Sequence, residues 1–106
     1  MKFAVLILTF VVSTGVLFGA GNAKEGKASY DKACKSCHGA DGTPNPAVMK
    51  MMKVEMKHLG DPEVQAQSDD KHTDIIKNGV GKMKPIRSLN DTQIADVVAF
   101  IKTLKK

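Results

Sequence analysis

Residues 34–38 form the stretch Cys34-Lys35-Ser36-Cys37-His38. Two thiols three positions apart, with a histidine directly after the second, are typical of covalent c-type haem attachment. Each thiol can bond one vinyl group of the porphyrin, and His38 then lies beneath the iron as its proximal ligand. The chain has only these two cysteines, so haem attachment uses both and leaves none for a disulfide. The motif predicts one covalently attached haem c per chain.

Other chemistries of a cysteine pair fit the sequence less well. A zinc site needs two further ligands at similar spacing. The candidates, His58 and His72, lie fourteen residues apart rather than the usual three to five. A thioredoxin-like dithiol requires strands in βαβ units, which this sequence lacks. Haem attachment is therefore the favoured chemistry of residues 34–38.

The chain is basic along its whole length rather than in one tract. Its 106 residues are enough for one domain and too few for two. Lysines and arginines number 16 against 11 acidic residues, giving a net charge of +5 and an isoelectric point near 9.3. This spread argues against a nucleic-acid-binding arm and favours a basic surface that steers the protein toward an acidic partner. Any single lysine can equally serve solubility.

The first 23 residues have the pattern of a secretory signal peptide. Lys2 gives a short positive start, and an apolar run follows from Phe3 to Phe18. Gly21 and Ala23 then place small residues where a signal peptidase cuts, so we expect cleavage after Ala23 and export to the periplasm. The alternative is an uncleaved N-terminal membrane anchor. The run is shorter than the ~20 residues that a spanning helix needs.

The remaining residues, 24–106, make a small domain that is poor in large apolar side chains. Tyr30 and Phe100 are its only aromatic residues. Domains of this size usually need a metal, disulfides or a cofactor for stability. Because the thiols are assigned to haem, we expect the haem to supply the apolar mass that the chain lacks.

Local signals predict an all-α domain. A first helix over 24–37 carries its small and apolar residues on one face, so both thiols point to the same side. A short helix over 47–52 follows a turn-rich segment, and a further helix runs from 68 to 78. The last helix begins at Asn90, where a capping box with Gln93 is expected. Its apolar positions recur at helical spacing: Ile94, Val97, Val98, Ile101 and Leu104.

The sixth position of the iron is assigned to Met83. This residue lies in the glycine-containing segment 79–85, which we expect to be a flexible loop with few hydrogen bonds. A neutral thioether ligand favours ferrous iron and raises the reduction potential. The alternatives are one of the four methionines at 49–56, which more often fill gaps in a core, and a histidine ligand, either His58 or His72.

The chain resembles bacterial monohaem class I cytochromes c over nearly its whole length after residue 23. The resemblance is carried by Gly-Lys-Ala-Ser-Tyr before Cys-Lys-Ser-Cys-His-Gly-Ala-Asp-Gly, by Gly-Val-Gly-Lys-Met-Lys-Pro, and by the last helix. It implies a cytochrome c fold, with three to five short helices wrapped around one covalent haem and the terminal helices crossing. By position it makes Cys34 and Cys37 the thioether residues, His38 the proximal ligand and Met83 the distal ligand.

The resemblance also implies three finer features. The terminal helices would cross with Gly26 against Phe100, and the carbonyl of Pro46 or Pro44 would accept the second N–H of His38. The chain departs from the family at Lys84, which precedes Pro85 where members often have proline directly after the methionine. Arg87 is a candidate partner for a haem propionate by charge alone.

The sequence thus predicts a periplasmic electron carrier rather than an enzyme, without nucleic acid and without stable membrane insertion after cleavage. Redox partners with acidic docking surfaces would meet a basic rim that includes Lys35, Lys82 and Lys84. One alternative is a haem-based redox enzyme or gas sensor whose sixth ligand is labile. Another is a metal-handling protein that binds Cu(I) through the methionines at 49–56.

Overall fold

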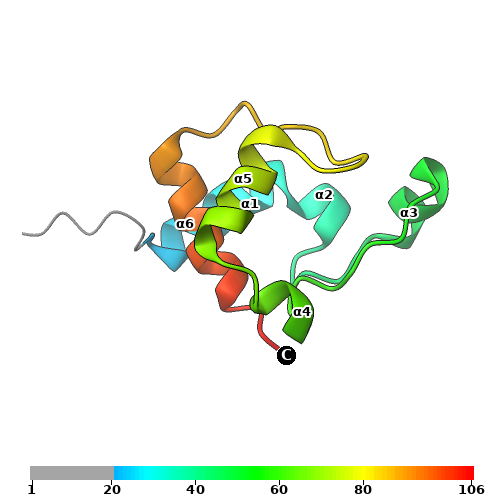
Figure 1. Cartoon of the computed structure of the whole chain (residues 1–106), viewed down its shortest axis with the longest axis horizontal. Helices are drawn as coiled ribbons and strands as arrows, with labels where there is room; N and C mark the ends of the chain where they lie inside the picture. The colour runs from blue at the N-terminus through cyan, green and yellow to red at the C-terminus, as the bar shows by residue number, and fades with distance from the viewer. Residues whose placement is uncertain (1–20) are drawn as a thin grey trace, which may run out of the picture.

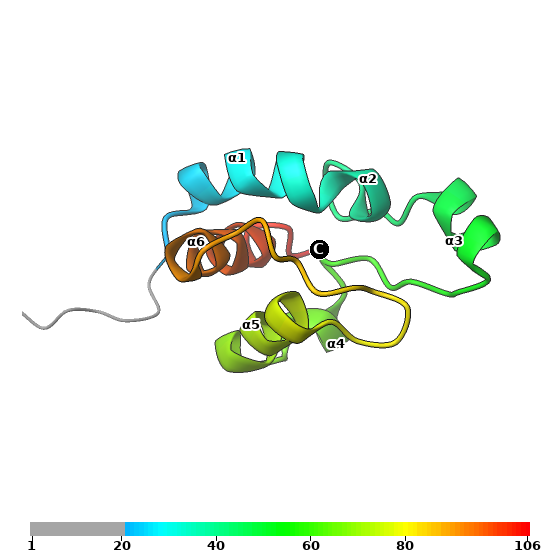
Figure 2. The ribbon, with the colours of Figure 1, turned by 90° about the horizontal axis from the view of Figure 1, so that it is seen from above.

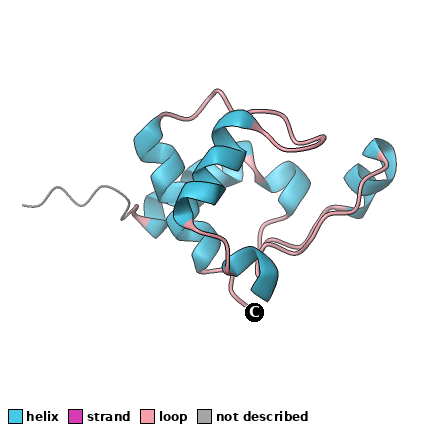
Figure 3. Cartoon of the chain, viewed as in Figure 1, coloured by secondary structure: helices cyan, strands magenta, loops and turns pink. Residues whose placement is uncertain are grey.

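The structure is a computed structural model that describes residues 21–106. The predicted signal peptide therefore lies outside the described residues except for its last three positions. The described chain contains six helices: α1 Ala23–Ala33, α2 Lys35–His38, α3 Pro46–Met52, α4 Pro62–Gln65, α5 Asp69–Asn78 and α6 Asp91–Lys102. Loops join them and no strand is drawn within this part of the chain (Figure 3). The predicted all-α class is confirmed.

The predicted helix over 24–37 is divided at Cys34. This residue ends α1 and precedes α2, with φ −122° and ψ −32°, outside the helical values. The four-residue α2 then carries Ser36, Cys37 and His38, and it ends at Gly39. The division makes the number of helices in the described chain larger than the three to five expected, and it turns the second thiol relative to the first.

Helices α1 and α6 cross at Gly26. A Cβ atom added to Gly26 would lie 1.9 Å from the carbonyl oxygen of Asp96, closer than any side chain allows. Phe100 packs instead on Tyr30, one turn farther along α1, with 4.9 Å between the ring centroids. The expected crossing of the terminal helices is therefore present. The expected pairing of Gly26 with Phe100 was wrong in detail, because the glycine faces the backbone of α6 and the two aromatic rings pair with each other.

The apolar core is built mainly from α6, with contributions from α1 and α5. Its buried members in the described chain are Tyr30, Cys34, Ile76, Ile94, Val97, Val98, Phe100 and Ile101. Helix α6 supplies five of these because its apolar residues recur every three or four positions. Helices α1 and α5 lie on either side of α6 (Figure 2). Cys34 thus connects the core directly to the predicted haem motif.

Two helix starts are fixed by side chains as the sequence indicates. Asn90 accepts a hydrogen bond from the Gln93 backbone at 2.8 Å, and the Gln93 side chain accepts one from the Asn90 backbone at 2.9 Å. This is the predicted capping box. Ser68 similarly accepts from the backbone of Lys71 at the start of α5. Local sequence signals therefore set the beginnings of both helices.

The start of α1 involves residues from the predicted signal peptide. The Asn22 side chain accepts hydrogen bonds from the backbones of Lys24 and Glu25, at 2.9 and 3.2 Å. Its own backbone N–H donates to a carboxylate oxygen of Asp96 at 2.8 Å. The boundary expected after Ala23 thus falls within the first turn of α1.

Helix α3 projects away from the rest of the molecule (Figure 1). It contains no buried residue, and Met51 on it is 76% exposed. The segment after α3 leads back from α3 toward α4 (Figures 1 and 2). The arm formed by residues 43–57 contributes Val48, Met52 and residues 54–57 to the lining of a cavity.

Candidate haem-binding site

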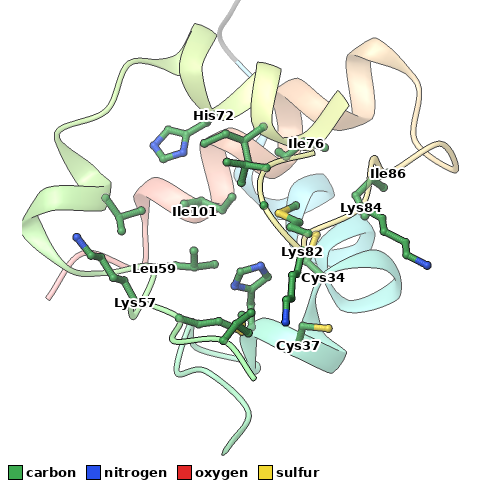
Figure 4. Close-up of a pocket in the computed structure, with 18 of the residues that line it drawn as sticks. Cys34, Cys37, Lys57, Leu59, His72, Ile76, Lys82, Lys84, Ile86 and Ile101 are labelled. Atoms are coloured by element: carbon green, nitrogen blue, oxygen red, sulfur yellow. The ribbon is translucent and has the colours of Figure 1, made fainter. Parts of the chain in front are cut away.

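A cavity of about 620 Å³ lies between the two cysteines, α5, and the segments 54–59 and 80–86. Its size falls in the range of about 300–1,000 Å³ typical of cofactor pockets. Most of its wall is apolar, and it includes Val48, Val54, Leu59, Val64, Ile75, Ile76, Ile86 and Ile101. In Figure 4, Cys34 and Cys37 lie on one side of the pocket and Leu59 and Ile101 on the other. A flat apolar cofactor bonded to both thiols fits this shape.

The motif 34–38 forms one wall of the cavity. Cys34 is 8% exposed and Cys37 is half-buried, and both thiols are free of disulfide bonding. Burial, and secondly the neighbouring Cys37, raises the pKa of the Cys34 thiol to about 11. Burial lowers the pKa of His38, which favours the neutral imidazole that can bind a metal. Cys34, Cys37 and His38 all line the cavity.

A hydrogen bond from the Tyr30 side chain and a glycine turn hold this wall in place. The phenol of Tyr30 donates to the carbonyl oxygen of Gly39 at 2.6 Å, just after His38. Gly39 itself has φ +72°, and a Cβ there would lie 2.2 Å from the carbonyl oxygen of Thr43. The turn that follows His38 therefore requires glycine.

Asn45 joins the motif to α3, and the sequence analysis missed this role. Its backbone N–H donates to the carbonyl oxygen of Cys37 at 2.9 Å, and its side-chain amide donates to that of Ser36 at 3.1 Å. Its side-chain oxygen caps α3. An asparagine followed by proline is a helix-start signal that could have identified the cap, but no local pattern indicates the contacts with residues 36 and 37.

The expected bond between His38 and a proline carbonyl is not formed. Nδ1 of His38 is buried and has no hydrogen-bond partner among the described residues. Pro46 is the first residue of α3, at the base of the projecting arm. Nδ1 of His38 is therefore an unpaired, buried polar atom of a residue that lines the cavity.

Another part of the cavity wall carries Met83. The backbones of Val80 and Met83 exchange two hydrogen bonds, at 3.0 and 2.9 Å, and Gly81 between them has φ +55°. The backbone of Ile86 then donates to the carbonyl of Ile76, which ties the segment to α5. The expectation of a loop with few hydrogen bonds was therefore wrong. A tight turn instead holds Met83 at the cavity wall.

The rival ligands are distributed unevenly around the cavity. Met52 and Met56 line it, and so does His72. Met49, Met51 and His58 do not, and Nδ1 of His58 accepts a hydrogen bond from the Gly60 backbone at 2.8 Å. Position in the structure therefore disfavours Met49, Met51 and His58 as ligands and leaves Met52, Met56 and His72 as alternatives to Met83.

Charged side chains form part of the cavity lining, and they include the acidic Glu55. Lys57, Lys82 and Lys84 line it, and Nζ of Lys82 donates to the carbonyl oxygen of Met52. Lys82 thus joins the Met83 turn to the projecting arm. Arg87, the propionate candidate by charge, does not line this cavity and lies instead beside a separate shallow depression. In the described residues, no helix is long and apolar enough to cross a membrane.

Comparisons with known proteins agree with this geometry. The sequence model of the family Cytochrome c matches residues 23–105. Among solved structures, the chain is similar to the KustC0563 c-type cytochrome, with 28% sequence identity and a TM-score of 0.67. That match covers 76% of this chain and 98% of the other. A search of curated proteins found no match. The chain therefore belongs to the cytochrome c family, whose members carry covalently attached c-type haem and transfer electrons.

Proposed function

We propose that this cytochrome is an exported, non-enzymatic carrier of single electrons with one haem bonded to Cys34 and Cys37. His38 is its proximal ligand and Met83 its distal ligand. The observation that carries the proposal is that these four residues line one apolar cavity together. The predicted signal peptide, residues 1–23, would direct the chain to the periplasm.

The residues of the cavity suit electron transfer rather than bond chemistry. Bound haem supplies a one-electron Fe(III)/Fe(II) couple. With His38 and Met83 both bound to the iron, no position would be open for a substrate, and the thioether of Met83 would favour the ferrous state. The apolar wall excludes water, which disfavours the more highly charged ferric state. The tight turn at 80–83 positions Met83 at the cavity wall.

The partner is proposed to be a redox protein with an acidic docking surface. Lys82 and Lys84 place positive charge along the lining of the cavity, Lys57 of the same lining is paired with Glu63, and Lys35 is exposed at the start of α2. Attraction between opposite charges speeds the encounter more than it strengthens the complex. Such docking is brief and sensitive to salt, as repeated turnover requires.

An absorption spectrum of the purified holoprotein in both oxidation states tests the ligand assignment. We expect a methionine–iron charge-transfer band in the ferric protein. The band should be lost in Met83→Ala and retained in Met52→Ala and Met56→Ala, which truncate other methionines of the same cavity. Retention of the band in Met83→Ala would refute the assignment.

Carbon monoxide distinguishes the carrier from the alternative with a labile sixth ligand. A closed site predicts that the reduced wild-type protein binds the gas weakly and slowly, whereas Met83→Ala binds it rapidly. Rapid, tight binding by the wild-type protein would instead support a gas sensor or haem enzyme.

A further inference from the structure

His72 is a buried polar residue that the proposed electron carrier does not yet use. It lies on α5, is 6% exposed, and lines the haem cavity. Its Nε2 atom is buried and has no hydrogen-bond partner among the described residues. Leaving such an atom buried and unpaired is unfavourable. A partner that occupies the cavity would remove this cost.

The position of His72 indicates which part of a haem it meets. His72 lies on the side of the pocket opposite Cys37, near Ile101 (Figure 4). In haem, the two vinyl groups that bond cysteines and the two propionates occupy opposite halves of the porphyrin. Attachment at Cys34 and Cys37 therefore turns the propionates toward the side where His72 lies. Carboxylates are the only polar groups on the rim of the macrocycle.

We propose that Nε2 of His72 hydrogen-bonds to a carboxylate oxygen of a haem propionate. The inference rests on the proposed attachment at Cys34 and Cys37, and it assigns the propionate partner that Arg87 does not supply. An imidazolium paired with a carboxylate would be a charge-assisted hydrogen bond, which is stronger than one between neutral groups.

The other charged groups near His72 do not oppose such a pair electrostatically. Burial lowers the pKa of His72 most, Asp69 raises it, Lys102 on α6 lowers it, and a hydrogen bond to the Val64 backbone raises it. Asp69 and Lys102 form an ion pair with each other, and their effects on the pKa of His72 have opposite signs. A carboxylate in the cavity would therefore be the decisive charge, and it would favour the protonated imidazole.

The bond would couple electron transfer to a proton. An electron delivered by the redox partner would lower the positive charge near the His72–propionate pair, so the pair would hold a proton from solvent more tightly after reduction. The pair therefore has a higher pKa in the ferrous protein than in the ferric protein. Between those two pKa values the reduction potential falls as pH rises, and outside them it is independent of pH.

The experiment measures the reduction potential of the full holoprotein against pH for the wild type, His72→Leu and His58→Leu. His58 is the matched control because it is partly buried but does not line the cavity. We expect the wild type and His58→Leu to share a pH-dependent region that His72→Leu lacks. An unchanged pH dependence in His72→Leu would overturn the proposal.

A second measurement needs no variant. In wild-type protein with isotope-labelled histidines, magnetic resonance should give a His72 pKa that is higher in the ferrous state than in the ferric state. Equal pKa values in both states would overturn the proposal, as would spectra showing that His72 ligates the iron. Loss of the Met83 assignment would show instead in the charge-transfer band, so the two failures are distinguishable.

Discussion

Substitution of Gly26 by alanine tests whether the contact between α1 and α6 limits the stability of the fold. The added Cβ would lie 1.9 Å from the carbonyl oxygen of Asp96 and 2.4 Å from its carbonyl carbon. Both are backbone atoms of a helix and cannot rotate away, so the helices must separate by about 1 Å. A gap of that size forfeits roughly a quarter to a half of each dispersion contact across the crossing. Tyr30 and Val97, both fully buried, would lose the most.

The expected cost follows from two opposing effects. Overpacking of a closed core typically costs about 1–3 kcal/mol, and the rigid neighbour at Gly26 places this case at the upper end. Alanine regains about 1 kcal/mol through its helix propensity. The net loss is therefore ~2 kcal/mol, which lowers the melting temperature of a domain this small by about 10 °C.

Thermal unfolding of the oxidised holoprotein, followed by circular dichroism, measures this effect. Ala28→Gly is the matched control because Ala28 is exposed on the same helix. It exchanges the same two residue types without a clash and should cost only about 1 kcal/mol through helix propensity. If Gly26→Ala melts at or above the wild-type temperature, propensity outweighs packing and the argument for a close crossing fails.

Two further predictions concern the chain start and the basic rim. Holoprotein that begins at Asn22 should melt about 4–8 °C above holoprotein that begins at Lys24, because the Asn22 cap contributes about 1 kcal/mol. Equal melting temperatures would show that the cap and the bond to Asp96 contribute nothing. Lys84→Glu should slow reduction by the anion ascorbate several-fold at low salt, with the difference vanishing at high salt, because the exposed charge is screened. Lys24→Glu, at the far end of α1, is the control, and an equal effect there would indicate net charge rather than a rim.

The sequence predicted most reliably what short-range contacts determine. The capping box of Asn90 and Gln93 and the start of α5 at Ser68 depend on residues within one helical turn, and both are present. The motif 34–38 identified the cofactor because covalent attachment needs a fixed spacing of thiols and histidine. These features do not depend on how distant parts of the chain pack.

The errors arose where distant residues or the backbone decide the structure. The division at Cys34 accompanies hydrogen bonds from Tyr30 and Asn45, whose contacts with the motif have no sequence pattern. The tight turn at 80–83 differs from the predicted flexible loop because two glycines are compatible with a tight turn and with a flexible loop. The burial of His72 depends on α4 and α6, and a histidine at one position of an amphipathic helix does not reveal it.

The structure also refines the expectation that haem completes a deficient core. The interface of α1 with α6 is already closed, since Tyr30 and Val97 are fully buried without any cofactor. The wall of the cavity formed by 48–59 and 80–86 is different, because in the described structure its apolar side chains are at best partly buried. Haem would cover these side chains and offer each wall a surface to pack on. The crossed helices therefore form a core of their own, whereas the arm of α3 and the turn of Met83 would gain apolar packing from haem.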